Sequence, residues 1–197
     1  MGAMSKRRGA TRERILRVLL NDPDSKLTKY RVSKKAEASF SWTHEFLQKL
    51  ENDGYVKATE VLDLEGLMRL WMRYRLKPSN RGYLIQKPLE LLRRTDLTYA
   101  LTTYQGETLV QGYLFPSRID LYVKRSDKDD WHELLSREGL VGDGNVRILF
   151  DDDHVFYNAV DVEGLRVVSL PQLIVDLLLE GGVCVEAAEM LLEKMGA

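Results

Sequence analysis

The first eighty residues alternate between apolar and polar positions in a way that predicts several short helices. Ile15, Val18 and Leu19 recur at the three- and four-residue spacing that places side chains on one face of a helix. We therefore expect a helix over residues 12–21, capped by the threonine that precedes it. Asp22-Pro23-Asp24 should end this helix, because proline cannot continue it.

Two further helices are predicted on either side of a tight turn. The first covers residues 29–36 and the second covers residues 41–52, where apolar positions again follow helical spacing. Ala38-Ser39-Phe40 lies between them and brings small residues that let two helices meet at a steep angle. The expected inward residues of the second helix are Thr43, Phe46, Leu47 and Leu50. This order of elements predicts a helix-turn-helix.

The opposite side of the helix over residues 41–52 is polar. In helix-turn-helix proteins, the first turn of the second helix is the part that usually reaches the base edges of DNA. The candidate DNA-binding residues on this side and in the turn are Ser39, Ser41, Trp42, His44, Glu45, Gln48 and Lys49. Asp53-Gly54 should end the helix, since glycine suits the left-handed position after a helix.

A two-stranded ribbon is expected next, which would complete a winged helix-turn-helix. Residues 56–62 and 68–76 have strand-like patterns, joined by Asp63-Leu-Glu-Gly66. In the second segment polar and apolar residues alternate with a period of two, so one face should be basic. That face would carry Arg69, Trp71, Arg73 and Arg75. Arginines on such a wing are well placed for phosphates or a minor groove.

Charge divides the chain into two halves. Residues 1–94 hold 21 Lys+Arg and 11 Asp+Glu, whereas residues 95–197 hold 8 and 19, although the whole chain has a net charge of −1. The basic half can bind a polyanion through counterion release. The acidic half would be repelled by DNA, so we expect its partner to be a protein.

Composition predicts a cytoplasmic protein in two parts. No apolar run approaches the length of a membrane span, and the single cysteine, Cys184, excludes an internal disulfide and favours a small buried role. The expected divisions are residues 1–10 as a tag remnant and basic lead, 11–78 as the winged helix-turn-helix domain, 79–96 as a linker with a bridging helix, and 97–197 as an acidic α+β domain.

The acidic half mixes predicted strands and helices, which gives an α+β fold class for the chain. Residues 97–101 fit either a short strand or the start of a helix that continues to about Gly112. The other expected strands cover residues 118–123, 145–150 and a hairpin over 160–168. The expected helices cover residues 127–136, 170–179 and 185–195, the second opened by a capping box in which Ser169 is the cap and Gln172 stands three residues later.

Several segments of this half resemble the AbiEi family, which comprises antitoxin-type transcriptional regulators of type IV toxin–antitoxin systems. They are Tyr99-Ala-Leu-Thr102, the loop with Pro116, Val167-Val-Ser-Leu-Pro-Gln-Leu-Ile-Val-Asp-Leu-Leu178, Gly181-Gly182 and Ala187-Ala-Glu189. The resemblance covers about residues 97–193. It implies a DNA-binding domain that represses its own operon, and a second domain for antitoxicity against a nucleotidyltransferase-like toxin, without tight direct complexing.

The second domain also looks distantly like a nucleotidyltransferase fold, so an enzyme is one alternative. Two Mg²⁺ ions on a triphosphate need clustered carboxylates. Here Gly106-Glu107 lacks the serine of the expected glycine-serine turn, and Asp120-Leu-Tyr122 has an aromatic residue in place of a second carboxylate. Asp151-Asp-Asp153 would have to supply a further ligand. We therefore expect no catalysis.

No cofactor or metal is predicted, because the three histidines are scattered and one cysteine cannot build a zinc site. The leading hypothesis is a DNA-binding autorepressor of AbiEi type. Its expected partners are double-stranded operator DNA and a toxin or other protein, and a homodimer stays open. Besides the enzyme, a stand-alone regulator whose second domain senses a ligand or dimerises also stays open.

Overall fold

The computed structural model describes residues 2–24 and 27–196, with side chains described from residue 9 onward. The chain divides between Lys77 and Pro78 into two compact units. Up to Lys77 it holds 17 Lys+Arg and 10 Asp+Glu, a net charge of +7; from Pro78 to Met195 it holds 12 and 20, a net charge of −8. The charge division seen in the sequence therefore follows the division of the fold.

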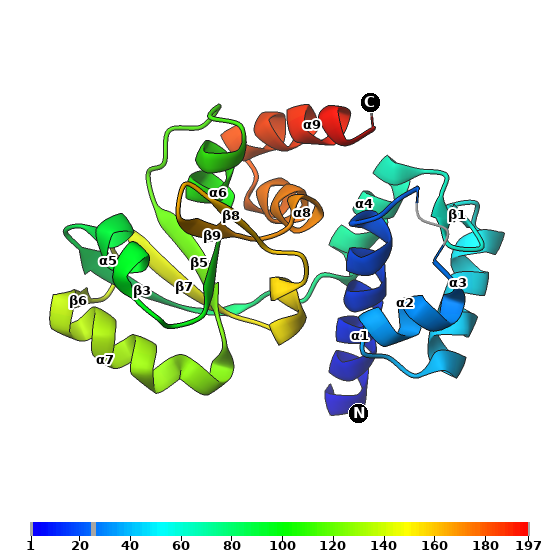
Figure 1. Cartoon of the computed structure of the whole chain (residues 1–197), viewed down its shortest axis with the longest axis horizontal. Coiled ribbons are helices and arrows are strands. Elements are labelled where there is room, and N and C mark those ends of the chain that lie inside the picture. Colours follow the sequence, from blue (N-terminus) through cyan, green and yellow to red (C-terminus); the bar gives the residue numbers. More distant parts are fainter. Residues whose placement is uncertain (1, 25–26, 197) are drawn as a thin grey trace. The chain divides into compact units, whose positions relative to one another are not determined.

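The first unit is mostly helical (Figure 1). Its described elements are α1 Gly2–Leu20, α2 Lys29–Lys35, α3 Phe40–Asn52, β1 Val56–Lys57, β2 Glu60–Val61 and α4 Leu64–Tyr74. The three helices predicted in this region are confirmed, but α1 begins well before residue 12. Residues 5–10 are thus helical, in keeping with the helix-forming lysine, arginine and alanine among them. None of the described helices has the length and apolar character that crossing a membrane requires.

The predicted second strand of the ribbon, residues 68–76, is wrong, because this segment belongs mainly to helix α4. Asp63 is the N-cap of α4, and its carboxylate accepts a hydrogen bond of 2.8 Å from the amide of Gly66, so the presumed hairpin turn opens a helix. Leu67, Met68 and Trp71 follow helical spacing and are fully buried. A short run of alternating apolar residues fits both the period of two of a strand and the period of about 3.6 of a helix. The methionines, leucines and arginines of this segment favour the helix.

The ribbon that remains is a small hairpin. Val56 pairs with Val61 and Lys57 pairs with Glu60, so each strand has two residues. Gly54 precedes it at φ +81°, the left-handed position expected after α3. The hairpin carries one lysine opposite one glutamate and so presents no arginine face.

The second unit is built around a mixed sheet. The described strands are β3 Ser79–Ile85, β4 Tyr99–Thr102, β5 Ile119–Val123, β6 Gly139–Val141, β7 Val146–Phe150, β8 Val160–Val162 and β9 Leu165–Val167. Among the described residues they form one sheet in the order β6-β3-β7-β5-β4-β9-β8. The β5–β7 and β4–β9 pairs are parallel and the other pairs are antiparallel.

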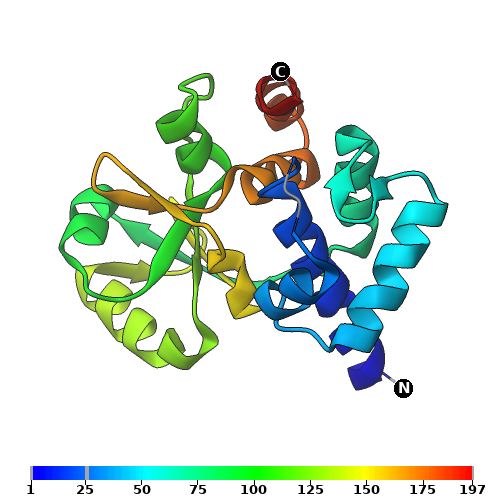
Figure 2. The same ribbon diagram turned by 45° about the vertical axis from the view of Figure 1, so that its right-hand side comes forward.

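Helices cover both faces of this sheet. The helices of this unit are α5 Pro88–Arg94, α6 Thr103–Val110, α7 Lys128–Glu138, α8 Leu170–Glu180 and α9 Val183–Gly196, with short 3-10 turns at η1 Arg125–Asp127 and η2 Asp153–Phe156, and α9 contacts the end of α6. Apolar residues of α5 and α7 pack on one face, as Leu92 and Trp131 do beside Leu121 of β5. α6 and α8 lie on the other side of the sheet, as Figure 2 shows. β5 is therefore buried along its whole length.

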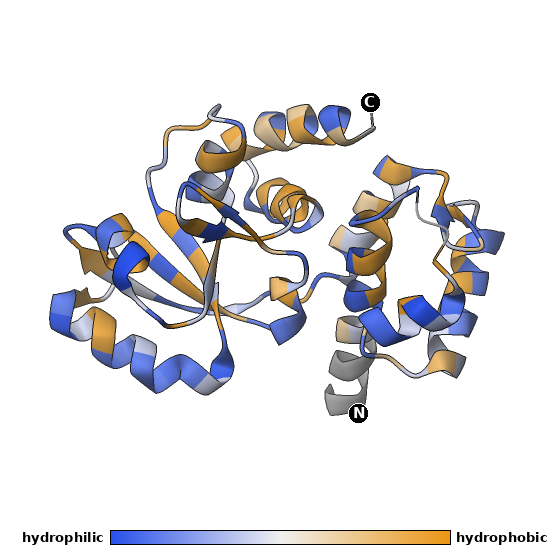
Figure 3. Ribbon diagram, in the orientation of Figure 1, coloured by the Kyte–Doolittle hydropathy of each residue, from blue (hydrophilic) through white to orange (hydrophobic). Residues whose placement is uncertain are grey.

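Most of the predicted elements of this unit are confirmed, and two expectations need correction. Residues 79–96 do not form a linker, because β3 lies inside the sheet between β6 and β7. Ser169 is the N-cap of α8, but its side chain makes no capping hydrogen bond, and the Gln172 amide donates to Asp176 Oδ1 at 2.8 Å. α8 is apolar around most of its circumference (Figure 3), and Cys184 of α9 is buried as expected.

Candidate functional site

The turn between α2 and α3 has a defined geometry. The amide of Glu37 donates to Lys34 O, and the amide of Ala38 donates to Ser33 O at 2.9 Å, which is the hydrogen-bond pattern of a Schellman cap. Glu37 occupies its left-handed position with φ +50°, where glycine is more usual. An ion pair of 2.7 Å with Arg14 of α1 holds the Glu37 side chain.

α3 has a buried face and a polar face, as predicted. The four expected inward residues, Thr43, Phe46, Leu47 and Leu50, are all buried. Thr43 also donates its hydroxyl hydrogen to Ser39 O at 2.9 Å, which ties the first turn to the preceding residue. The candidate contacts that are exposed are Ser39, Ser41, Glu45, Gln48 and Lys49. Ser41, Glu45 and Gln48 are spaced by four and three residues, so they follow one another along one stripe of the helix.

Trp42 and His44 are half-buried and contact neighbouring rings. The Trp42 ring lies 5.4 Å from the Phe46 ring, with the guanidinium of Arg12 at 6.0 Å from the Trp42 centroid. His44 stacks on Phe40 with 5.9 Å between centroids. These contacts give Trp42 and His44 a packing role beside the polar stripe.

The three predicted arginines do not share one face. Arg69 and Arg73 are exposed on α4, four residues apart, and Arg69 pairs with Glu65 at 2.5 Å. Arg75 follows the last turn of the helix, and its side chain is 3% exposed. Its Nη1 lies 3.0 Å from Glu13 Oε2 of α1. The structure therefore places Arg75 in the interior of the first unit, where it cannot reach a ligand in solution.

Glu13 joins α1 to the end of α4 through several donors. Besides Arg75, its carboxylate accepts hydrogen bonds from Trp71 Nε1 at 3.2 Å and from the amide of Leu76 at 2.9 Å. A buried carboxylate is costly unless it is paired and hydrogen-bonded, and here it is both. This network fixes the position of the helix that sequence periodicity alone assigned to a strand.

Asp120 of β5 is the centre of a charge cluster in the second unit. It is fully buried, and both oxygens contact arginines: Arg118 Nε at 2.7 Å from Oδ1, and Arg147 Nη2 at 2.8 Å from Oδ2. Both arginines also reach Glu180 at the end of α8, at 2.7 and 2.9 Å. Thr103 donates a further hydrogen bond to Asp120 Oδ2. Two cations and two carboxylates thus form a balanced group, named here the Asp120 cluster.

The pKa values in the Asp120 cluster follow from this pairing. Hydrogen bonding to Asp120, together with Glu180, raises the pKa of Arg118 above its ordinary value despite partial burial. Burial acts to raise the pKa of Glu180, but the hydrogen bonds from Arg118 and Arg147 outweigh it and lower that pKa. Arg118, Arg147 and Glu180 are therefore charged at neutral pH.

The positions singled out for metal-dependent chemistry have structural contacts instead. Glu107 accepts hydrogen bonds from the amides of Tyr113 and Leu114 at 3.1 and 2.8 Å, which fixes the loop after α6. Tyr122 donates its hydroxyl hydrogen to Asp176 Oδ2 at 2.9 Å. Asp152 accepts from the amide of His154 and caps η2. Within the described ranges, no three His, Cys, Asp or Glu side chains gather in a way that could hold a metal ion.

The sequence reading missed the residues that complete the Asp120 cluster. Arg118 immediately precedes β5 and lies two residues before Asp120, so the predicted strand over residues 118–123 already placed both on one face. Arg147 stands beside Asp120 because β5 and β7 pair in parallel register, and predicting this neighbour requires knowledge of the sheet topology.

Comparison of the chain with protein-family models, curated proteins and solved structures gives no match.

Proposed function

We propose that the first unit binds double-stranded DNA through a helix-turn-helix formed by α2 and α3. The observation that carries this proposal is the exposed polar stripe of α3, which stands after a tight, hydrogen-bonded turn in a unit of net charge +7. Short hydrogen-bonding side chains at the start of such a helix are those that reach base edges in a major groove. Ser41, Gln48 and Lys49 are the proposed contacts.

In this proposal the wing makes fewer DNA contacts than the sequence predicted. The β1–β2 hairpin offers Lys57, and α4 offers Arg69 and Arg73, all of them exposed. These cations suit phosphate contacts, which position a protein on DNA without reading sequence. Arg75 is left out of the interface because it is buried with Glu13.

A mobility-shift titration on the DNA upstream of the chain's own gene tests DNA binding. We expect binding that weakens steeply as salt rises, since it depends on released counterions. Gln48→Ala should reduce the preference for that DNA over random duplex, whereas Lys49→Ala should weaken both. Lys128→Ala, an exposed lysine of the acidic unit, is the matched control and should change neither. Absence of binding to any duplex at low salt would refute the proposal.

We further propose that the chain is an AbiEi-like autorepressor whose acidic unit serves antitoxicity or binds a protein. The support is the order of a basic unit before an acidic one, together with the segments that resemble this family. Co-expression with the product of the neighbouring gene tests it. Growth arrest caused by that product and relieved by this chain would support an antitoxin, and no relief would oppose it.

The acidic unit is proposed to lack nucleotidyltransferase activity. Asp120 would have to bind Mg²⁺, yet both of its oxygens already contact arginine, and the net charge of the Asp120 cluster is zero. Divalent metal ions in such enzymes need several free carboxylate oxygens. Incubation with labelled nucleotide and Mg²⁺ should show no transfer. Transfer that disappears in a folded Asp120→Asn variant would overturn this view.

A further inference from the structure

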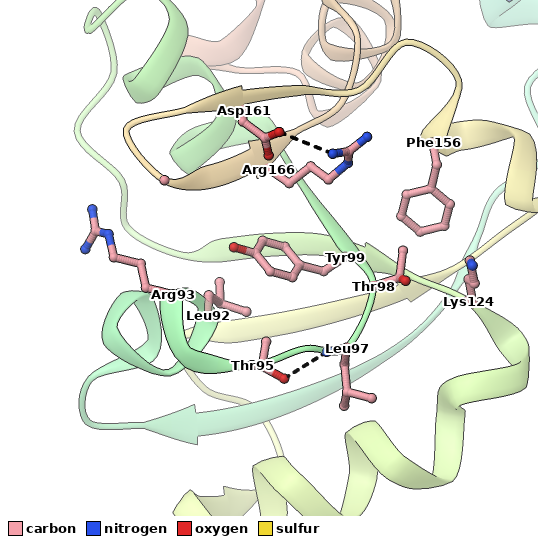
Figure 4. A pocket seen from close by; sticks show the side chains of 11 residues that line it. Leu92, Arg93, Thr95, Leu97, Thr98, Tyr99, Lys124, Phe156, Asp161 and Arg166 are labelled. Carbon is pink, nitrogen blue, oxygen red and sulfur yellow. Dashed lines mark hydrogen bonds and ion pairs between the residues drawn. The ribbon is translucent and has the colours of Figure 1, made fainter.

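A pocket of about 500 Å³ opens in the second unit and shares no residue with the Asp120 cluster (Figure 4). It lies between the end of α5, the start of β4 and the β8–β9 hairpin, and its lining includes Arg93, Tyr99, Lys124, Phe156, Asp161 and Arg166. We name it the hairpin pocket. Its volume is within the range of roughly 300–1,000 Å³ that small-molecule sites occupy.

The charge of the hairpin pocket is opposite to that of the unit around it. Arg93, Lys124 and Arg166 contribute three cations and Asp161 one carboxylate, in a unit whose net charge is −8. In the view of Figure 4, Arg93 and Lys124 lie at opposite ends of the pocket, and Arg166 lies between them above the Tyr99 ring. Cations on several sides of one cavity favour an anionic ligand.

These cations are available to a ligand. Arg166 Nη1 lies 3.4 Å from Asp161 Oδ2, with the two side chains 43% and 69% exposed, and such a pair contributes little. Arg166 Nη2 also donates to Ala159 O at 3.4 Å, a long hydrogen bond that a phosphate oxygen can replace. Within the described part of the chain, neither Lys124 nor Arg93 pairs with a carboxylate. Lys124 is half-buried as a residue, so part of its aliphatic stem lies against the pocket wall.

The hairpin pocket also has a fixed aromatic wall. Tyr99 is 7% exposed and packs edge-on against Trp131 with 6.2 Å between centroids. Phe156 of η2 is half-buried and stands at the end of the pocket where Lys124 and Thr98 lie (Figure 4). The pocket therefore offers flat apolar surface beside its cations.

We propose that the hairpin pocket binds a small organic phosphate of mononucleotide size. Arg166 and Lys124 hold the phosphate groups, since a guanidinium fork and an ammonium both match phosphate oxygens. The hydroxyl of Thr98, which no described residue engages, adds a donor at the same end. The flat group of the ligand lies against Phe156 and Tyr99. This site is independent of the proposed DNA interface, because all its residues belong to the second unit.

Calorimetric titration of the full chain with ADP, pyrophosphate and adenosine tests the proposal. ADP should bind, and pyrophosphate should bind about tenfold more weakly because it lacks the group that contacts the aromatic wall. Adenosine, which carries no phosphate, should give no measurable heat. Binding of ADP should also weaken as sodium chloride is raised, since the cations are reached from solvent.

Three substitutions locate the binding. Arg166→Met and Lys124→Met should each weaken ADP binding about tenfold or more, the size expected for losing a charge-assisted hydrogen bond. Asp161→Asn should strengthen it severalfold, because Arg166 loses its competing carboxylate. Arg137→Met removes an exposed arginine of α7 outside the pocket and should leave affinity unchanged.

Two results would overturn the proposal. The first is no heat with ADP at millimolar concentration in the unmodified chain. The second is binding that survives Arg166→Met and Lys124→Met unchanged, which would place the ligand elsewhere, for example on the basic unit. Each variant is first compared with the unmodified chain by thermal unfolding, so that lost affinity is assigned only to folded protein. A gain of affinity in Asp161→Asn cannot come from misfolding, which keeps the test decisive.

Discussion

Two arginines at the end of α4 should respond differently to alanine substitution. In a strand, Arg73 and Arg75 would share one face and act alike on DNA. In the structure Arg73 is exposed, whereas the Arg75 side chain is 3% exposed and paired with Glu13 at 3.0 Å. Arg75→Ala should therefore lower the stability of the first unit, and Arg73→Ala should lower DNA affinity with little effect on stability.

The size of the Arg75 effect follows from what remains around Glu13. Removing one member of a buried ion pair costs about 3–5 kcal/mol, because the other charge is left uncompensated. Glu13 keeps hydrogen bonds from Trp71 Nε1 and the amide of Leu76, so we expect a loss near the lower end, about 3 kcal/mol. An exposed substitution such as Arg73→Ala should stay within about 0.5 kcal/mol.

Urea denaturation followed by tryptophan fluorescence measures this difference. Trp71 is buried beside Glu13 and reports on the first unit, while Trp131 reports on the second. A double variant, Glu13→Gln with Arg75→Met, should recover part of the stability, because it removes the unpaired charge. Equal stability of Arg73→Ala and Arg75→Ala, with equal loss of DNA binding, would refute the helical placement and support a shared face.

Three further outcomes are expected. The pKa of Glu180 is lowered in the folded protein, so the ionised Glu180 stabilises the fold at pH values above the ordinary pKa of 4.5, and this stabilisation is lost as pH falls through the lowered pKa. Glu180→Gln should therefore flatten the acid side of a plot of the unfolding midpoint against pH. Thr28→Ala removes the hydroxyl that accepts from the Arg31 amide at 3.2 Å, and chemical denaturation should show a loss of about 1 kcal/mol. Gly82→Ala would put a methyl group 2.6 Å from the carbonyl oxygen of Gly142, so its melting temperature should fall well below that of Ser79→Ala in the same strand; equal values would contradict the close approach of β3 to that turn.

Helical periodicity was the most reliable guide along this chain. The buried face of α3 was readable from Thr43, Phe46, Leu47 and Leu50, because four residues over two turns leave little ambiguity. The prediction for residues 68–76 was wrong because the pattern there is ambiguous. Its apolar residues fit a period of two and a period near three and a half equally well. In the structure the N-cap contact between Asp63 and Gly66 shows that the segment is a helix. In the sequence, the same aspartate and glycine, three residues apart, also suit a turn between two strands.

In the second unit, local pattern predicted β5, β7 and the β8–β9 hairpin, but it missed β3 and β6 and the residues that lie across the strands. Arg118 and Asp120 share a face by alternation, yet Arg147 joins them only because β5 and β7 are parallel neighbours. Glu180 arrives from the end of α8, sixty residues after Asp120 in the chain. The hairpin pocket likewise gathers Arg93 from α5, Lys124 from the residue after β5 and Arg166 from β9. Both sites depend on tertiary arrangement, which single-sequence periodicity does not encode.

The net charge of a unit predicts its partner only after buried and paired charges are separated from exposed ones. In the basic unit Arg75 is cancelled by Glu13, and Arg17 is 1% exposed with its guanidinium 5.1 Å from the Trp71 centroid. Neither can release a counterion from DNA, so the salt slope of binding should reflect only exposed cations such as Lys49 and Arg73. In the acidic unit the reverse holds. Arg118 and Arg147 are neutralised within the Asp120 cluster, whereas among the described residues Arg93 and Lys124 of the hairpin pocket pair with no carboxylate, so we propose an anion site in a unit of charge −8.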